Sequence, residues 1–169
     1  MAARASKSKK GSGASSASKQ QPEPVLCRED PVFFIDKCLG LRIVPEALRA
    51  IGAKVELKTD HFPEDTKDTD WLPVVGSRRW IILSKDKNLR HNQLEIIGLL
   101  QANTHSFLLT TGSMTGPEMA AAFVAAMPDM LGIIASISPP VVGSVSKAGA
   151  VRVLFTGDEL MDRASEPKS

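Results

Sequence analysis

The chain has 169 residues, of which 43% are hydrophobic and 24% are charged, and these values are typical of one soluble globular domain with some additional tail. The formal net charge of +2 averages two unlike regions, because residues 1–24 carry five basic residues and one acid, while the remainder carries 16 basic and 18 acidic residues. The net charge of residues 25–169 is therefore not that of a basic nucleic-acid-binding protein. This excludes histone-like and zinc-finger-like binding, but not an enzyme that holds cations in an acidic pocket.

The sequence also bears on location. No run of about 18 apolar residues is free of breakers and polar side chains, so we predict no membrane-spanning helix. The basic first residues are not followed by an apolar segment, which argues against a secretory signal. Cys27 and Cys38 stand in no CxxC motif or Cys/His cluster, which favours reduced structural thiols over a zinc finger. We therefore expect a cytoplasmic protein that does not bind a membrane.

Residues 1–24 (MAARASKSKKGSGASSASKQQPEP) consist mainly of Ser, Ala, Gly and Lys, and no apolar residue among them is larger than Met1. Such a segment buries too little surface to offset the entropy lost on ordering, which predicts a disordered basic tail. A solubilising role is the favoured interpretation, and a weak electrostatic contact with RNA is the alternative.

From residue 31 to residue 156, short apolar runs alternate with amphipathic segments, which predicts one domain of alternating strands and helices. We expect strands at 32–35, 55–57, 80–83 and 107–109, a hairpin of 141–145 with 151–155, and helices at 42–50, 69–76, 89–102 and 118–136. Residues 157–169 are expected to form a flexible tail. This alternation favours an α/β fold of three layers, α/β/α, with a mainly parallel sheet and a C-terminal β-hairpin.

Polar residues follow the predicted strands, at the edge where ligands bind in parallel sheets. The first strand is followed by Asp36, the second by Lys58, Thr59 and Asp60, the third by Ser84, Lys85 and Asp86, and the fourth by Thr110 and Thr111. If the sheet is parallel, Asp36 and Asp86 emerge at the same edge, within reach of one cation.

The segment after the second strand adds five carboxylates within eleven residues, namely Asp60, Glu64, Asp65, Asp68 and Asp70. Carboxylates that converge on one edge repel each other unless a hard cation lies among them. Oxygen ligands without nearby His or Cys favour Mg²⁺ or Mn²⁺ over zinc. Such an ion can activate a water molecule and bind a phosphodiester oxygen, which is the chemistry of a nuclease.

These residues also have structural interpretations. An Asp after a strand is commonly a turn residue, and an acidic loop is by default solvated, so the sequence leaves open which acids of 60–70 point inward. The run Thr115-Gly116-Pro117-Glu118 fits a capping box, which makes Glu118 a structural residue. Lysines such as Lys85 at the edge of a sheet bind phosphate or are simply solvated.

The segments FFIDKCLG, EALRAIGAKVELKTDHFPEDTKDTDWLPVVG, WIILSKDKNLR and LLTTGSMTGPEMAAAF together resemble the PIN-like domain family, in particular its bacterial toxin-type, VapC-like ribonucleases. The similarity spans roughly residues 31–156. It implies a PIN-like α/β fold whose acidic cluster holds Mg²⁺ or Mn²⁺ for hydrolysis of RNA phosphodiesters. Matched to the family pattern, Asp36, Asp68 and Asp86 would be the metal ligands and the catalytic residues.

Further residues and partners complete this hypothesis. We expect Lys85, Arg90 and Thr111 to bind phosphate or RNA, and the second-tier site candidates are Asp60, Asp70 and Glu118. The toxin analogy implies a small antitoxin-like protein that covers the same edge of the sheet. Exposed apolar surface on the 118–136 helix or on the hairpin would instead form a homodimer.

The chain departs from the family pattern in two places. Asn88 stands where many relatives have a second acid, and Thr110, Thr111 and Ser113 stand where a fourth acid often follows the fourth strand. Three acids favour one metal ion over two. The departures keep a second hypothesis open, that of a non-catalytic PIN-like module that binds RNA or a protein. A phospho-accepting receiver domain fits less well. Such domains need a lysine after a fifth parallel strand, and here the fifth strand runs into a hairpin.

Overall fold

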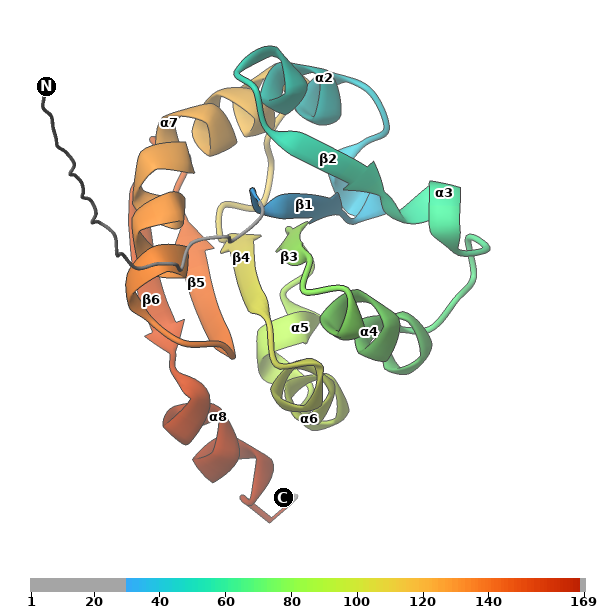
Figure 1. Ribbon diagram of the computed structural model, residues 1–169, viewed down its shortest axis with the longest axis vertical. Helices are drawn as coiled ribbons and strands as arrows, with labels where there is room; N and C mark the ends of the chain where they lie inside the picture. Colours follow the sequence, from blue (N-terminus) through green and yellow to red (C-terminus); the bar gives the residue numbers. More distant parts are fainter. Residues whose placement is uncertain (1–29, 168–169) are drawn as a thin grey trace, which may run out of the picture. The chain divides into compact units, whose positions relative to one another are not determined.

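The structure is a computed structural model that describes residues 30–167 (Figure 1). The predicted tail at 1–24 and Cys27 lie outside the described residues. The strands are β1 (Val32–Ile35), β2 (Lys54–Leu57), β3 (Ile81–Ser84), β4 (His105–Leu109), β5 (Val141–Val145) and β6 (Val151–Phe155). The helices are α2 (Ile43–Ala50), α3 (Lys58–His61), α4 (Asp68–Ser77), α5 (Asn88–His91), α6 (Gln93–Ala102), α7 (Gly116–Ser136) and α8 (Gly157–Ala164), with a 3₁₀ turn at Lys37–Leu39.

The strands form one sheet in the order β2-β1-β3-β4-β5-β6. The first five strands of this order are parallel, and β6 pairs with β5 in the antiparallel direction. The mainly parallel sheet and the C-terminal hairpin are thus confirmed. The order also places the ends of β1 and β3 side by side, so the residues that follow these two strands share one edge.

Successive residues along each central strand point to opposite faces of the sheet, as strand geometry requires. Phe33 and Ile35 pack into a core under α2 and α7, whereas Phe34 between them packs into a second core under α4, α5, α6 and α8. Two apolar clusters therefore lie on the two faces of the sheet, which confirms the three-layer α/β/α arrangement.

The predicted helix at 89–102 is two helices. Asn92 separates α5 from α6, and its side-chain oxygen accepts a hydrogen bond from the Leu94 backbone N–H at 2.9 Å. An Asn in extended conformation that caps the following helix satisfies a backbone donor that would otherwise have no partner. The amphipathic pattern continued across this break, so it predicted one element.

Residues 157–164, predicted as flexible tail, form helix α8 instead. The Thr156 backbone N–H donates to Glu159 Oε1 at 2.9 Å, and Leu160 is buried in the core under α6. The Gln93 side chain of α6 also donates to the carbonyl oxygens of Ala164 and Glu166, at 3.2 and 2.7 Å. A capped helix with one buried leucine is short enough to escape detection by periodicity.

Helix α7 is long and apolar enough, by length and composition alone, to cross a membrane. From the sequence we predicted no helix of this kind. The core helix of a soluble protein passes the same test. Seven residues of α7, including Phe123 and Met130, are buried, and its apolar side packs against α2 and the sheet.

Candidate metal centre

Asp36 directly follows β1 and is buried at the edge of the sheet. Its backbone N–H donates to the Leu83 carbonyl oxygen at 3.0 Å, which extends the pairing of β1 with β3 by one residue. Its carboxylate oxygen Oδ2 accepts hydrogen bonds from Ser84 Oγ at 2.8 Å and from the Cys38 thiol at 3.5 Å. Burial and the charge of Asp36 raise the pKa of Cys38, which keeps the thiol protonated and able to donate.

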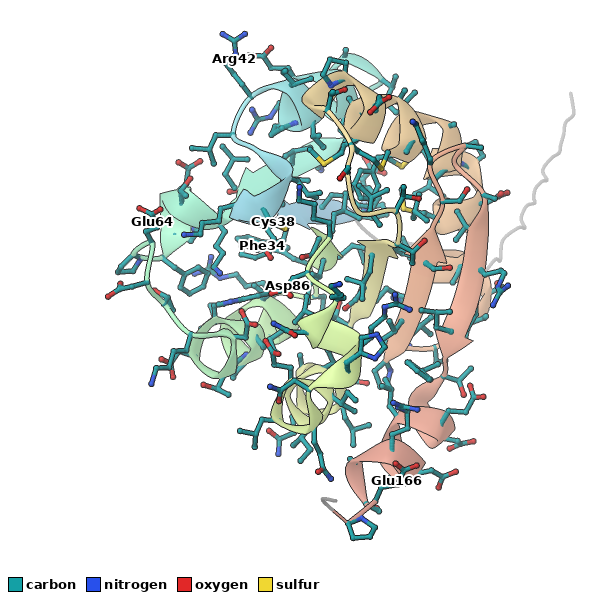
Figure 2. All side chains as sticks on the ribbon, turned by 180° about the vertical axis from the view of Figure 1, so that it is seen from behind. Phe34, Cys38, Arg42, Glu64, Asp86 and Glu166 are labelled. Atoms are coloured by element: carbon teal, nitrogen blue, oxygen red, sulfur yellow. The ribbon has the colours of Figure 1, made fainter. Side chains whose placement is uncertain are left out.

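Ser84, the last residue of β3, links Asp36 to the loop that carries Asp86. While its hydroxyl donates to Asp36, its oxygen accepts from the Asp86 backbone N–H at 3.0 Å. The Lys85 backbone N–H donates to Cys38 Sγ at 3.3 Å, which places Cys38 and Asp86 near each other at this edge (Figure 2). The Asp86 carboxylate accepts from the Asn88 backbone N–H at 2.9 Å. These hydrogen bonds fix the turn after β3, so the turn orients the Asp86 carboxylate.

Asp68 is the first residue of α4, on the other side of the site. The Trp71 indole N–H donates to Asp68 Oδ1 at 2.7 Å, and the Trp71 ring is fully buried. Because a buried ring one turn along the same helix holds this carboxylate, its orientation is restricted. Among the acids of 60–70, the structure thus turns Asp68 inward.

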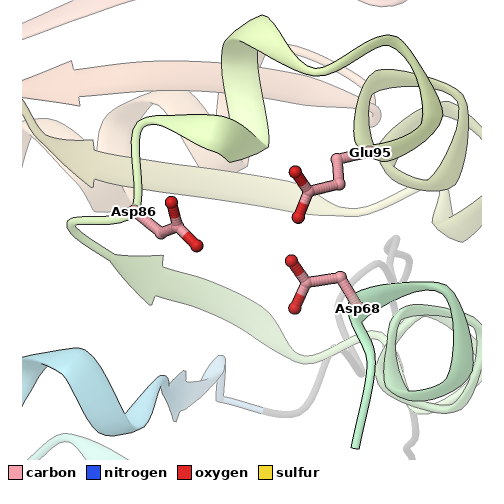
Figure 3. A group of neighbouring side chains, drawn as sticks. All are labelled: Asp68, Asp86 and Glu95. Atoms are coloured by element: carbon pink, nitrogen blue, oxygen red, sulfur yellow. The ribbon is translucent and has the colours of Figure 1, made fainter.

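Glu95 completes the site, and sequence reasoning missed it. Oxygen atoms of Asp68, Asp86 and Glu95 all lie within 4.8 Å of one another, and the three carboxylates point toward a common centre from α4, the β3–α5 loop and α6 (Figure 3). Glu95 lies in the first turn of α6 because that helix starts after Asn92. A single acid within the apolar run LEII was the available signal.

Glycines bring α4 and α6 close enough for Asp68 and Glu95 to meet. A Cβ atom at Gly76 in α4 would overlap the backbone of Ala102 at the end of α6. A Cβ at Gly98 in α6 would lie 2.8 Å from Leu72 Cδ1 of α4. Gly76 therefore has no room for a side chain, because the neighbouring atoms are backbone, whereas at Gly98 the end of the Leu72 side chain would have to shift. The two helices pack closely along the length that carries Asp68 and Glu95.

The electrostatics of the cluster are those of closely spaced carboxylates that a cation would stabilise. Burial, a hydrogen bond with Asp68 and the charges of Asp68, Asp86 and Asp36 together raise the pKa of Glu95 to about 8. One of the acids therefore takes up a proton at neutral pH, which is the expected response of crowded carboxylates. Three carboxylates without a His or Cys nitrogen or sulfur donor among them suit a hard divalent cation such as Mg²⁺ or Mn²⁺.

The remaining predicted site residues lie in different places. Asp36 is outside the group of three acids, and its Oδ1 lies 3.6 Å from Lys58 Nζ instead. Lys85, Arg90 and Thr111 are half-buried, in the β3–α5 loop, in α5 and in the loop after β4. Asp60 and Asp70 are exposed on α3 and α4.

Glu118 has the structural role that its sequence context indicated. Its side chain accepts from the Thr115 backbone N–H at 2.9 Å, and Thr115 Oγ1 accepts in turn from the Glu118 backbone N–H at 3.3 Å. Glu118 also forms an exposed ion pair with Lys147 at 3.1 Å. This capping box and the ion pair lower the pKa of Glu118 and occupy its carboxylate.

Comparison with known proteins connects this site to a family. The model of the PIN-like domain family matches residues 31–111, a range that contains Asp36, Asp68, Asp86 and Glu95. Over 138 residues the chain is 26% identical to a Mycobacterium tuberculosis protein named "Putative ribonuclease VapC45", and this match covers 79% of the chain and 99% of that protein. No solved structure gives a significant match.

Proposed function

The chain belongs to the PIN-like domain family, and from this premise we propose that the protein is a metal-dependent endoribonuclease that hydrolyses RNA phosphodiester bonds. The observation that carries the proposal is the convergence of Asp68, Asp86 and Glu95 from three separate elements. Fixed carboxylates directed at one point match the oxygen donors that Mg²⁺ and Mn²⁺ take in nucleases.

In this proposal Asp68, Asp86 and Glu95 hold the divalent ion. When bound, such an ion supplies an activated water and stabilises the charge that develops on the phosphate. The chain contributes the orientation of its ligands, since Trp71 holds Asp68 and the Asn88 N–H holds Asp86. Asp36, predicted as a ligand, instead acts through Ser84, whose hydroxyl joins it to the Asp86 turn.

Substrate binding falls to basic and hydroxyl groups at the same edge. Lys85 precedes Asp86, Arg90 is the third residue of α5, and Thr111 follows the neighbouring strand β4. Lysine and arginine neutralise phosphates without reading base sequence, so these residues would hold the RNA backbone. In this proposal these residues balance the charge of the RNA backbone next to the acidic cluster.

The likeness to a protein named as a ribonuclease of the VapC type extends the proposal to partners. A toxin of this type would act in the cytoplasm and be silenced by an antitoxin-like protein that covers the acidic edge. A homodimer through α7 or the β5–β6 hairpin is the alternative use of exposed apolar surface, which on α7 includes Leu131.

The test compares Asp86→Asn with the wild type and with Asp70→Asn, a matched change at an exposed acid outside the cluster. Mn²⁺ binding is measured by calorimetry, and cleavage is followed with end-labelled RNA. We expect Asp86→Asn to lose binding and to cleave about a hundredfold more slowly or worse, because a metal ion contributes several kcal/mol to such a reaction. Asp70→Asn should behave as wild type. Binding without cleavage in the wild type would reject the ribonuclease and favour the non-catalytic module.

A further inference from the structure

Lys58 is a buried lysine within the candidate metal centre. It directly follows β2 and begins α3, and its side chain is 8% exposed. Burial of an ammonium group costs much free energy unless anionic partners surround it. The position of this side chain therefore depends on the groups around its nitrogen atom.

Two carboxylates and an aromatic ring surround the Lys58 ammonium group. Nζ lies 3.6 Å from Asp36 Oδ1 and 4.0 Å from Asp68 Oδ1, and 4.8 Å from the centre of the Trp71 ring. Both oxygen distances are longer than a good hydrogen bond, so Lys58 acts as a point charge between the carboxylates rather than as a directed donor. This is the placement of a cation between two ligands.

Asp68 takes part in two sites at once. Its carboxylate belongs to the group with Asp86 and Glu95, and the same carboxylate, through Oδ1, faces Lys58 together with Asp36. A carboxylate shared by two adjacent positive charges is the usual bridge in nucleases with two metal ions, which lie about 3.5–4 Å apart. With Glu95 included, the centre has four acids, enough for two ions, yet a protein cation stands at one of the two positions.

We propose that the Lys58 ammonium group permanently fills the second cation position of this centre, between Asp36 and Asp68, so that the protein binds a single divalent ion. The inference rests on the metal site of the proposed function and deepens it. It makes Lys58 a positioning residue, because it holds Asp36 and Asp68 in place from a buried position without access to RNA.

The experiment measures how many Mn²⁺ ions the full chain binds. Calorimetry gives the number of ions per chain, and electron paramagnetic resonance detects the magnetic coupling of two adjacent Mn²⁺ ions. The variants are Lys58→Met, which keeps the aliphatic stem without the charge, and Lys147→Met as a matched control, since Lys147 pairs with Glu118 at the surface. We expect one ion in the wild type and in Lys147→Met, and a coupled pair in Lys58→Met.

Two further variants make this result specific. The double variant Asp36→Asn with Lys58→Met lacks a ligand of the second position and should return to one ion without coupling. Lys58→Gln is also neutral but keeps a polar end in this polar surrounding, which makes it the better-tolerated form of the same test, and it should also bind two ions. If either neutral variant is unfolded without metal, saturating Mn²⁺ should restore its circular dichroism spectrum.

Several outcomes would overturn the inference: a wild type that binds two ions, neutral Lys58 variants that stay at one ion, or unfolded variants that Mn²⁺ fails to restore. None of these readouts uses RNA, so the two proposals fail in different ways. A wild type that binds one ion but cleaves no RNA would reject the ribonuclease and leave the role of Lys58 standing. A wild type that binds no Mn²⁺ would overturn both.

Discussion

Helices α2 and α7 cover one face of the sheet, and helices α4 and α6 cover the other, but the two layers contribute differently to the site. The side of α7 that faces the sheet consists of Ala, Met and Phe, while the acids of this helix, Glu118 and Asp129, lie away from the core. In the second layer, Asp68 of α4 and Glu95 of α6 turn half-buried carboxylates toward one point. One layer therefore stabilises the fold, and the other also builds the metal centre.

This difference means that stability and metal binding can be changed separately. A substitution under α7 should lower the free energy of unfolding and leave the affinity for Mn²⁺ unchanged. A substitution between α4 and α6 should lower both. The following predictions test this separation, beginning with the largest effect.

The first prediction concerns Phe123, which is fully buried between α7 and the sheet. Phe123→Ala should lower the free energy of unfolding by about 3–5 kcal/mol, because the lost apolar contacts leave a cavity in the core. Denaturant unfolding measures this loss, and calorimetry on the protein that remains folded should give wild-type affinity for Mn²⁺. A weakened affinity would show that the two layers are coupled through the sheet.

The second prediction applies the same substitution to both layers. Gly76→Ala places a methyl group against the backbone of Ala102, so α4 must move away from α6. We expect a loss of about 1–3 kcal/mol in stability from overpacking, together with weaker Mn²⁺ binding as Asp68 and Glu95 separate.

Gly132→Ala in α7 is the matched control, since a Cβ there meets no atom within 4 Å. In an exposed helix position, alanine is favoured over glycine by up to about 1 kcal/mol, so this variant should be slightly more stable and bind Mn²⁺ as wild type does. If Gly76→Ala retained full affinity, the contact of α4 with α6 would not determine the ligand geometry.

The third and smallest effect is on pH dependence. The pKa of Glu95, raised to about 8 from 4.5 chiefly by burial, lies above its value in the unfolded chain. The folded protein therefore binds more protons than the unfolded chain in this window, and stability that is full below about pH 4.5 is lost as the pH rises toward 8. We expect the Tm of the metal-free protein to fall over this range and Mn²⁺ to remove the fall.

Glu95→Gln is the control for this prediction, because it cannot titrate. His105 acts in the opposite sense: burial lowers its pKa from 6.5, so its contribution is full above about pH 6.5 and is lost as the pH falls below that value. The difference in Tm between wild type and Glu95→Gln isolates the carboxylate from the imidazole. Equal pH profiles for the two proteins would contradict the crowding of acids in the metal-free centre.

The sequence by itself determined the order of the elements and one edge of the site. Unbroken apolar runs marked the central strands β1 and β3, because a parallel strand buried on both faces has no polar alternation, whereas the edge strand β2 carries Lys54 and Glu56. For a parallel sheet the sequence then predicted Asp36 and Asp86 at the same edge, and the parallel pairing of β1 with β3 confirms this placement. Chain-local signals also found the capping box at Thr115 and Glu118.

Tertiary structure decided which side chains meet at that edge. Glu95 joins Asp68 because Asn92 restarts the helix and Gly76 lets α4 approach Ala102 closely. In the sequence Lys58 is one more lysine after a strand. It is buried because the Asp36 carboxylate that follows β1 and the Asp68 carboxylate and Trp71 ring of α4 close around it. The periodicity of a sequence indicates which face of a helix or strand is apolar. The distances between polar groups are set by the packing of one helix against another, which depends on residues far apart in the chain.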